Sequence, residues 1–259
     1  MTHTFFKYQG TGNDFVMIDN RHQNFDKNDT KLIAHLCDRR FGIGGDGLIL
    51  LENYDTSDFR MVYFNSDGNE SSMCGNGGRC IMHFAHYLGI VDDEAAFMAI
   101  DGLHNAKIVG DKVHLQMQDV LSIEKRNNYV FLNTGSPHHV ERCKNVNGLN
   151  VREEGSKIRY SNLYKEEGSN VNFVEKIDEI TFKVRTYERG VEDETLSCGT
   201  GVTAVALAMY YIGETEKNML TIDTKGGELS VSFSNNNGSF DDIWLIGPAT
   251  QVYKGEIEW

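Results

Sequence analysis

Two stretches of the sequence repeat one pattern, in which a Cys-Gly-X-Gly motif is followed by a helix-like segment that closes at a glycine. One stretch runs from Cys74 to Gly89 and the other from Cys198 to Gly213, with the cysteine and the closing glycine equally spaced in both. One internal duplication without shorter repeats indicates two related domains rather than a solenoid. A chain of 259 residues is long enough for two domains of ordinary size.

The duplication predicts a domain boundary near residue 118. The expected halves are residues 1–118 and 119–250, because the order of strands and helix-like segments starts again near Tyr129. We expect the short final segment, 251–259, to be able to pair back onto the first half.

The helix-like segments that follow the two cysteines are too apolar to lie on a surface. Residues 202–212 are almost entirely apolar, and residues 81–88 are similar apart from His83 and His86. A helix that is apolar all round is buried all round. Much of the remaining chain has the alternating pattern of strands, so we expect a sheet to curl around each helix. The predicted fold class is therefore α+β, a mixed α/β fold with a curled, mainly antiparallel sheet around a central helix in each half.

Shorter patterns predict the other elements. A helix capped by Asn28 or Asp29 is expected to run to about Arg39, and a weaker helix is expected at 149–160. The glycine-rich segment Gly42–Gly47 is interpreted as a set of turns. Strands are expected at 4–8, 15–19, 48–51, 59–64, 96–101, 105–109, 112–118, 129–132, 170–175, 180–187, 219–224, 228–234, 242–246 and 250–256.

The position of the two cysteines indicates acid–base chemistry. A cysteine at a helix N-terminus has a lowered thiol pKa, because free backbone N–H groups and the helix dipole favour the thiolate. The same N–H groups can hold a carboxylate, and the glycines let them approach it closely. Two such sites facing each other would place a base and an acid on either side of one carbon. A lone cysteine is commonly a small core residue, and that is the interpretation given to Cys37, Cys80 and Cys143.

Composition excludes several classes of partner. The formal net charge is −13 and no run of lysine or arginine occurs, which argues against nucleic acid and against an anionic membrane surface. No signal peptide and no apolar stretch long enough to span a membrane is visible. Five cysteines without an export signal are expected to be free thiols in a reducing cytoplasm. Without Cys-X-X-Cys spacing, or a third ligand beside His83 and His86, no metal site is expected.

The adjacent charges Glu188 and Arg189 lie shortly before the second cysteine. A carboxylate there can bind an ammonium group, and a guanidinium can bind a carboxylate through two hydrogen bonds. Asn13, Asn65 and Asn170 occur at turn-compatible positions, where turn formation alone explains any one of them.

Taken together, these motifs closely resemble those of diaminopimelate epimerases. The resembling stretches fall in order across nearly the whole chain, and they are Lys7–Phe15, Asn65–Gly68, Cys74–Cys80, Asn170–Phe173, Glu188–Gly190 and Cys198–Gly201. The resemblance implies two pseudo-symmetric α/β domains with the site in the cleft between them, and a homodimer. It also implies an isomerase that interconverts LL- and meso-2,6-diaminopimelate, a small-molecule substrate on the route to lysine and peptidoglycan. Neither pyridoxal phosphate (PLP) nor a metal is implied, so no cofactor is expected.

The resemblance also implies a role for individual residues. Cys74 and Cys198 are expected to be the two catalytic acid–base groups, and Glu188 is expected to contact an ammonium group of the substrate. The residues expected to hold the distal end of the substrate are Asn13, Asn65, Asn170 and Arg189. The backbone N–H groups expected to hold the reacting carboxylate are those of Gly75, Asn76, Gly199 and Thr200.

The sequence departs from the family pattern in two places. Ser136 precedes Pro137 and His138, where the family often has an asparagine, so that one amide contact becomes a hydroxyl or is lost. Ser136 and His138 are therefore only supporting candidates. The loop at 190–195 is one residue longer than the commoner form.

Two other classes of function remain open from the sequence. One is another isomerase of the same fold, of the proline racemase or phenazine-biosynthesis type. Proline racemases typically have Cys-Gly-His at the first cysteine, where this chain has Cys74-Gly75-Asn76, and the phenazine type lacks the cysteine pair. The second class is a thiol redox or metal-binding protein, which would need neither Gly-X-Gly after both cysteines nor the Glu188–Arg189 pair.

The cysteine pair predicts sensitivity to oxidation. If each sulfur approaches the α-carbon to roughly 3–3.5 Å, the two sulfurs stand about 7 Å apart. That separation is too large for a disulfide unless the empty site collapses. We expect activity to require a reductant and oxidation to trap a Cys74–Cys198 bond, detected by peptide mapping. Full activity of the intact protein under strong oxidant would contradict this prediction.

Overall fold

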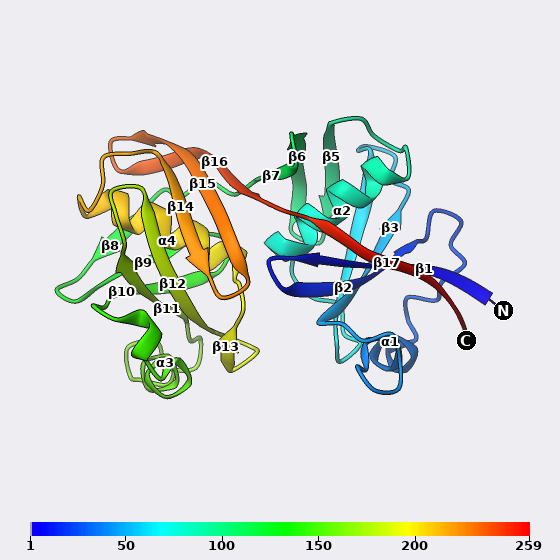
Figure 1. Cartoon of the computed structure of the whole chain (residues 1–259), viewed down its shortest axis with the longest axis horizontal. Coiled ribbons are helices and arrows are strands. Elements are labelled where there is room, and N and C mark those ends of the chain that lie inside the picture. The colour runs from blue at the N-terminus through cyan, green and yellow to red at the C-terminus, as the bar shows by residue number, and fades with distance from the viewer. Residues whose placement is uncertain (1) are drawn as a thin grey trace. The chain divides into compact units, whose positions relative to one another are not determined.

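The computed structural model of the protein describes residues 2–259, which fold into two compact units (Figure 1). Unit 1 runs to Leu115 and also contains the C-terminal segment Gly247–Trp259. Unit 2 consists of Gln116–Ile246.

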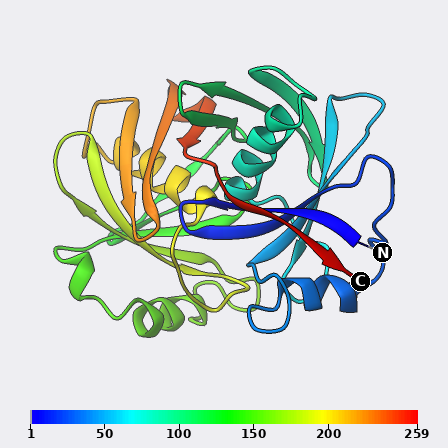
Figure 2. The ribbon, with the colours of Figure 1, turned by 45° about the vertical axis from the view of Figure 1, so that its right-hand side comes forward.

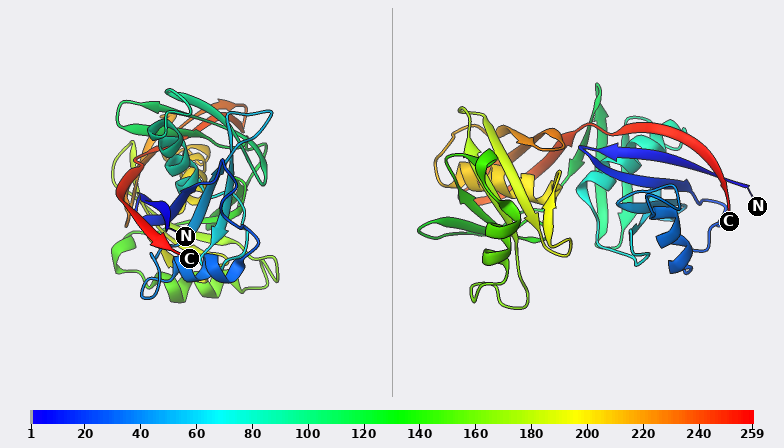
Figure 3. Two further views of the ribbon diagram at one scale, coloured as in Figure 1. Left: turned by 90° about the vertical axis from the view of Figure 1, so that its right-hand side faces the viewer. Right: turned by 60° about the horizontal axis from the view of Figure 1, so that its bottom comes forward.

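Unit 1 is a sheet with two helices. Its elements are β1 (Thr2–Gly10), β2 (Asn13–Asp19), α1 (Thr30–Cys37), β3 (Gly47–Glu52), β4 (Phe59–Asn65), α2 (Gly75–Tyr87), β5 (Glu94–Ala99), β6 (Gly102–Val109), β7 (Lys112–Gln116) and β17 (Thr250–Glu258). Strand β1 lies between β2 and β17 and is antiparallel to both (Figure 3). The pairs β2–β3 and β4–β5 are parallel, and α1 and α2 supply the crossover that each parallel pair needs.

Unit 2 repeats this arrangement. Its elements are β8 (Ile123–Lys125), β9 (Tyr129–Asn133), β10 (Pro137–Arg142), the 3₁₀ turn η1 (Val146–Gly148), α3 (Val151–Arg159), β11 (Asn170–Lys176), β12 (Thr181–Glu188), β13 (Asp193–Thr195), α4 (Gly199–Tyr211), β14 (Met219–Thr224), β15 (Gly227–Asn236) and β16 (Ser239–Gly247). The parallel pairs are β10–β11, with α3 between them in sequence, and β12–β14, which α4 separates. The other named pairs in the unit are antiparallel. The predicted α+β fold with an internal duplication is confirmed.

Each unit encloses one helix. In Figure 2, α4 (yellow) lies between the orange strands and the green strands of its own unit. Every residue of α4 from Gly201 to Met209 is buried, as its apolar sequence predicts. The first turns of α2 are buried in the same way, including the fully buried charged residue Arg79. Burial on all sides fixes where the first turn of each helix lies in its own unit.

Several local predictions hold and a few do not. Asp29 caps α1 by accepting a hydrogen bond from the Leu32 N–H, as expected. The sequence interpretation missed β8, β10 and β13. Strand β10 begins at Pro137, and proline is tolerated as the first residue of a strand. The strands expected at 4–8 and 15–19 are longer than predicted, because β1 runs to Gly10 and β2 already begins at Asn13.

The enclosure of α4 predicts a large cost for a cavity there. Leu207 is fully buried in α4, so Leu207→Ala should lower the free energy of unfolding by about 2–5 kcal/mol. The matched control Leu121→Ala truncates a leucine that is 82% exposed and should change it by less than about 0.5 kcal/mol. Urea unfolding followed by circular dichroism measures both, and equal losses would contradict the enclosed position of α4.

Candidate active site

Both duplicated cysteines occupy the same structural position. Cys74 is the N-cap residue of α2 and Cys198 is the N-cap residue of α4, each with an extended backbone. The first turn of a helix presents backbone N–H groups that have no partner within the helix. Each unit therefore places a thiol beside a helix N-terminus, where both a thiolate and a carboxylate are favoured.

Three of the predicted residues come together around the first cysteine. The Cys74 thiol donates to Oδ1 of Asn13 over 3.5 Å, and Nδ2 of Asn76 donates to the same oxygen over 3.3 Å. Nδ2 of Asn13 donates in turn to Oδ2 of Asp46 over 2.6 Å. Asn13 thus links the first turn of α2 to the loop that precedes β3.

Arg79 lies beneath this group and is fully buried. Its Nη2 donates to Oδ1 of Asn76 over 3.0 Å and to the hydroxyl of Thr11 over 3.2 Å. Burial lowers the pKa of Arg79 to about 10, and nearby Cys80 and Cys74 oppose that shift. The guanidinium therefore remains charged at neutral pH.

Asp46 belongs to a surface network of charges. Arg39 donates to Oδ1 of Asp46 over 2.8 Å and binds both oxygens of Asp14. Asp14 also pairs with Lys7 at 2.7 Å. Burial alone would raise the pKa of Asp14, but the hydrogen bonds from Arg39 and Lys7 lower it to about 2. The network keeps the Asp14 carboxylate ionised.

The second cysteine has different neighbours. The Sγ atom of Cys198 lies 3.5 Å from the hydroxyl of Thr200, and either atom can be the donor. The Thr200 carbonyl accepts from the hydroxyl of Thr134 over 2.9 Å. A Cβ atom at Gly201 would lie 2.5 Å from Oδ1 of Asn172, so this motif position has no space for a side chain.

A further group of predicted residues meets where β10 and β11 begin. Nδ2 of Asn170 donates to the Ser136 hydroxyl over 2.8 Å and to the Pro137 carbonyl over 3.1 Å. Oδ1 of Asn170 accepts from the backbone N–H of Arg189 over 2.9 Å. The hydroxyl of Ser136 thus supplies a hydrogen-bond partner at the position where the family pattern has an amide.

The remaining predicted residues lie at strand ends. Asn65 is the exposed last residue of β4. Glu188 ends β12, and its Oε2 accepts from the Thr195 hydroxyl over 2.9 Å. The Arg189 guanidinium donates to the Glu167 carbonyl over 3.0 Å. The structure therefore places these three side chains near strand ends, with Glu188 and Arg189 bound to different partners.

His138 is fully buried in β10. Its Nδ1 lies 3.1 Å from Nδ2 of Asn172, whose Oδ1 accepts from the Thr186 hydroxyl. Because Asn172 presents its N–H₂ group, the imidazole accepts at Nδ1 and carries its proton at Nε2. Within residues 2–259, His138 Nε2 has no hydrogen-bond partner. Burial, and next the positive charge of Arg189, lower the pKa of His138 to about 3.

The other three cysteines form no disulfide within the described chain. Cys37 and Cys80 are buried, as expected, and burial raises the pKa of both thiols to about 12. Cys143 is only partly buried and packs against the small cluster around α3, and burial raises its pKa as well.

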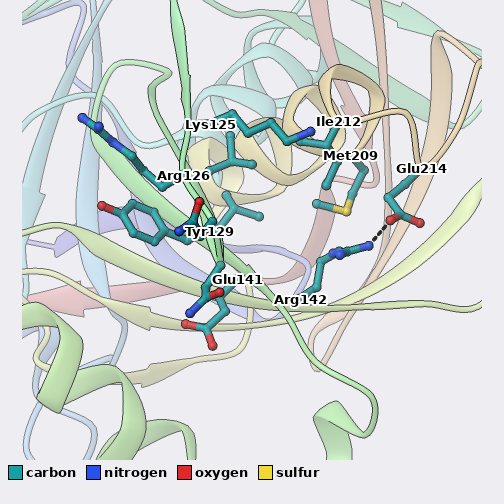
Figure 4. Close-up of a pocket in the computed structure, with 12 residues that line it drawn as sticks. Lys125, Arg126, Tyr129, Glu141, Arg142, Met209, Ile212 and Glu214 are labelled. Atoms are coloured by element: carbon teal, nitrogen blue, oxygen red, sulfur yellow. Dashed lines mark hydrogen bonds and ion pairs between the residues drawn. The ribbon is translucent and has the colours of Figure 1, made fainter.

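Unit 2 also contains a pocket of about 370 Å³ that holds none of the predicted site residues (Figure 4). Its lining residues come from β8–β10, the loop between β8 and β9, and the C-terminal end of α4. Arg142 and Glu214 point toward one another there and form an ion pair. Helix α4 has 13 residues and is therefore about 20 Å long, so the pocket lies at the opposite end of the helix from Cys198.

Sequence interpretation missed two residues that bear on the site. Asp46 lies in the glycine-rich segment interpreted as turns, and Arg79 lies between Cys74 and the segment 81–88 that was interpreted as apolar. The sequence did contain a sign of each residue. Asp46 is the single charged residue in Gly-Gly-Asp-Gly, and Arg79 is the single charged residue in Gly-Gly-Arg-Cys.

Neither a metal-binding cluster nor a membrane-spanning helix is found among the described residues. Residues 2–259 contain no group of three or more His, Cys, Asp or Glu side chains arranged to hold a metal ion. Over the same range, no helix combines the length and the apolar character needed to cross a lipid bilayer.

Comparison with known proteins gives one consistent family. The diaminopimelate epimerase family profile matches residues 5–120 and 130–252. The diaminopimelate epimerase of Flavobacterium psychrophilum is 58% identical over 97% of this chain and 99% of that protein. The diaminopimelate epimerase of Chlorobaculum tepidum is 43% identical over 96% of this chain and 98% of that protein.

Solved structures resemble the chain in fold. A PhzF-family phenazine biosynthesis protein of Bacillus anthracis matches with a TM-score of 0.80 and 14% identity over 100% of both chains. A hydroxyproline epimerase of Agrobacterium vitis matches with a TM-score of 0.69 and 14% identity, over 99% of this chain and 92% of that chain. At this identity the likeness is one of fold alone.

The burial of His138 predicts a loss of stability in acid. Between the unfolded pKa of about 6.5 and the folded pKa of about 3, the unfolded chain binds a proton that the folded chain does not. The free energy of unfolding should therefore fall by about 1.5 kcal/mol from pH 6.5 to pH 5 through this group. Urea unfolding across that range should show this contribution missing in His138→Gln and retained in the exposed control His22→Gln. An unchanged pH dependence in His138→Gln would refute the assignment.

Proposed function

Because the chain belongs to the diaminopimelate epimerase family, we propose that it interconverts LL- and meso-2,6-diaminopimelate with Cys74 and Cys198 as its acid–base pair. It is an isomerase, and the proposed reaction uses no PLP. The observation that carries the mechanism is the equivalent position of the two cysteines, each the N-cap residue of an enclosed helix. A core role alone would not require a thiol at the same helix end in both units.

The reaction is a proton transfer at one α-carbon. One cysteine, as thiolate, removes the α-proton, so that the C–H bond breaks, an S–H bond forms and the electron pair is delocalised into the carboxylate. The other cysteine, as thiol, then donates its proton to the opposite face, so that its S–H bond breaks and a new C–H bond forms. The protein is left with the two protonation states exchanged, and the thiols therefore titrate as a coupled pair.

Stabilisation of the carbanion is the main energetic demand, because no cofactor serves as an electron sink. We assign this task to the N–H groups of Gly75, Asn76, Gly199 and Thr200, which belong to the first turns of α2 and α4. Fixed dipoles of this kind act on developing charge without reorganisation. Gly201 supports the assignment for the second motif, since it has no room for a side chain beside Asn172.

Recognition of the distal amino-acid end is assigned to polar residues outside the cysteine motifs. Arg189 and Glu188 are proposed to contact its carboxylate and an ammonium group, respectively. The residues proposed to assist them are Asn13, Asn65 and Asn170, with Ser136 and His138 in support. The hydrogen bond from the Arg189 N–H to Asn170 supports a shared role, because it couples the backbone of the arginine to the strand that carries the asparagine.

The broader setting follows from the same family membership. We propose a homodimer that acts in the cytoplasm and supplies a precursor of lysine and peptidoglycan. We also propose that residues 1–118 and 119–250 are the two halves of the duplicated epimerase. The racemase and phenazine alternatives are not favoured, since proteins of those types resemble the chain at 14% identity while the cited epimerases reach 58%.

Incubation with meso-diaminopimelate in deuterated water tests the proposal. Deuterium should enter at one α-carbon, because the proton returned to the carbon comes from a thiol that exchanges with solvent. Cys74→Ala and Cys198→Ala should each lower the rate by roughly 10²-fold or more, the usual contribution of an acid–base group. Mass spectrometry of the recovered amino acid measures the incorporation.

The matched control for these variants is Cys143→Ala, which removes a partly buried cysteine outside the proposed site and should leave the rate unchanged. Deuterium incorporation into proline and none into diaminopimelate would reject the proposed substrate. Full incorporation in either catalytic variant would reject the two-cysteine mechanism.

A further inference from the structure

A directional chain of hydrogen bonds runs past Cys74. Arg79 Nη2 donates to Asn76 Oδ1 over 3.0 Å, and Asn76 Nδ2 donates to Asn13 Oδ1 over 3.3 Å. Asn13 Nδ2 donates to Asp46 Oδ2 over 2.6 Å. Two neutral amides are therefore linked in series between a buried cation and a carboxylate.

The charges at the two ends allow only one direction for this chain. A guanidinium has donors and no acceptor, so Asn76 must present its oxygen to Arg79. An ionised carboxylate has acceptors and no donor, so Asn13 must present its nitrogen to Asp46. Asp46 is kept in place by Arg39, which donates to its other oxygen over 2.8 Å. Neither amide can be turned over without losing a hydrogen bond to a charged group.

We propose that Asp46 and Arg79 are positioning residues that hold the Asn13 carbonyl oxygen against Cys74 Sγ and so stabilise the thiol form of Cys74. The supporting distance is 3.5 Å from the sulfur to Asn13 Oδ1. A carbonyl oxygen accepts a hydrogen bond from an S–H group but has nothing to offer a thiolate. The inference rests on the proposed function only for its consequence: a raised pKa keeps Cys74 protonated, so that this cysteine begins the reaction as the proton donor.

Of the other charged or titratable groups near Cys74, some favour its thiolate form and some have little effect on its protonation. The charged Arg79 guanidinium and the N-terminus of α2 favour the thiolate. Burial keeps Cys80 a neutral thiol, and the charge of Asp46 is countered by Arg39. The Asn13 carbonyl offsets the first two effects. A residue that must be an acid in one direction of reaction and a base in the other needs such a balance.

The second cysteine has a neighbour of a different kind. The hydroxyl of Thr200, 3.5 Å from Cys198 Sγ, can either donate or accept, so it can serve thiolate and thiol alike. Equivalent positions at the helix ends therefore do not give the two thiols the same side-chain neighbours.

The isosteric change Asp46→Asn tests the proposal. The side chain of Asp46 is 43% exposed, so the substitution leaves the core intact. An asparagine there can donate as well as accept, so the orientation of the Asn13 amide is then held only by the 3.3 Å hydrogen bond from Asn76, and the amide can turn its N–H₂ group toward the sulfur more easily. The apparent pKa of Cys74, measured from the pH dependence of its alkylation by iodoacetamide with peptide mass mapping, should fall by roughly 0.5–1 unit. Asp46→Glu keeps an acceptor-only group and should retain a value near that of the unaltered protein.

A double-mutant cycle separates positioning from direct charge effects. Removing the negative charge of Asp46 would also lower the pKa of Cys74 through space. In an Asn13→Ala background, positioning through Asn13 predicts that Asp46→Asn has little further effect on Cys74. A shift that persists in full in that background, an absent shift in Asp46→Asn, or an equal shift in Asp46→Glu would each overturn the proposal.

The alkylation measurement needs no substrate and is therefore independent of the proposed function. If no deuterium is incorporated but the pKa of Cys74 shifts as expected in Asp46→Asn, the epimerase function is rejected and the positioning role is kept. If deuterium is incorporated normally but the pKa of Cys74 does not shift, the positioning role is rejected and the epimerase function is kept. Alkylation of Cys143 in the same samples provides the internal control for reagent reactivity.

Discussion

In each unit, a single helix is enclosed by the strands of its own sheet, and the other features of the site depend on that enclosure. A helix buried on all sides cannot tilt or slide without opening cavities, so its first turn has one position relative to the surrounding strands. Cys74 and Cys198 are each the residue at which such a turn begins. The enclosure thus converts an apolar sequence pattern into a fixed position for a thiol beside the N–H groups of a helix N-terminus.

The duplication of the fold does not make the two thiols alike. In unit 1 the polar partners of Cys74 are an amide chain between Arg79 and Asp46, whereas in unit 2 Cys198 lies beside a hydroxyl that belongs to its own helix turn. Equivalent backbone positions with different side-chain partners suit a reaction that is chemically symmetric in its two steps but acts on two different stereoisomers. The backbone N–H groups at the two helix N-termini serve both proton-transfer steps in the same way, and the different side-chain partners of the two thiols distinguish one step from the other.

Much of the fold and part of the site could be predicted from local patterns. The Cys-Gly-X-Gly repeats, the apolar residues 202–212 and the Asp29 cap each depend on residues a few positions apart, and each was found. Strand β10 was not predicted; it begins at Pro137, and proline is disfavoured inside a strand but tolerated as its first residue. Asp46 was missed because the glycines around it indicate turns, and nothing in the local sequence shows that the loop reaches Asn13.

The sequence alone determined that two related halves exist, that each contains a buried helix and that a thiol stands where each helix begins. These features follow from periodicity and composition within short segments. Only the tertiary structure decided the direction of the Asn13 and Asn76 amides, the burial of Arg79 and the pairing of Asn170 with Ser136. The physical reason is that an amide can present either its oxygen or its nitrogen. The choice depends on charged or polar partners contributed by distant parts of the chain.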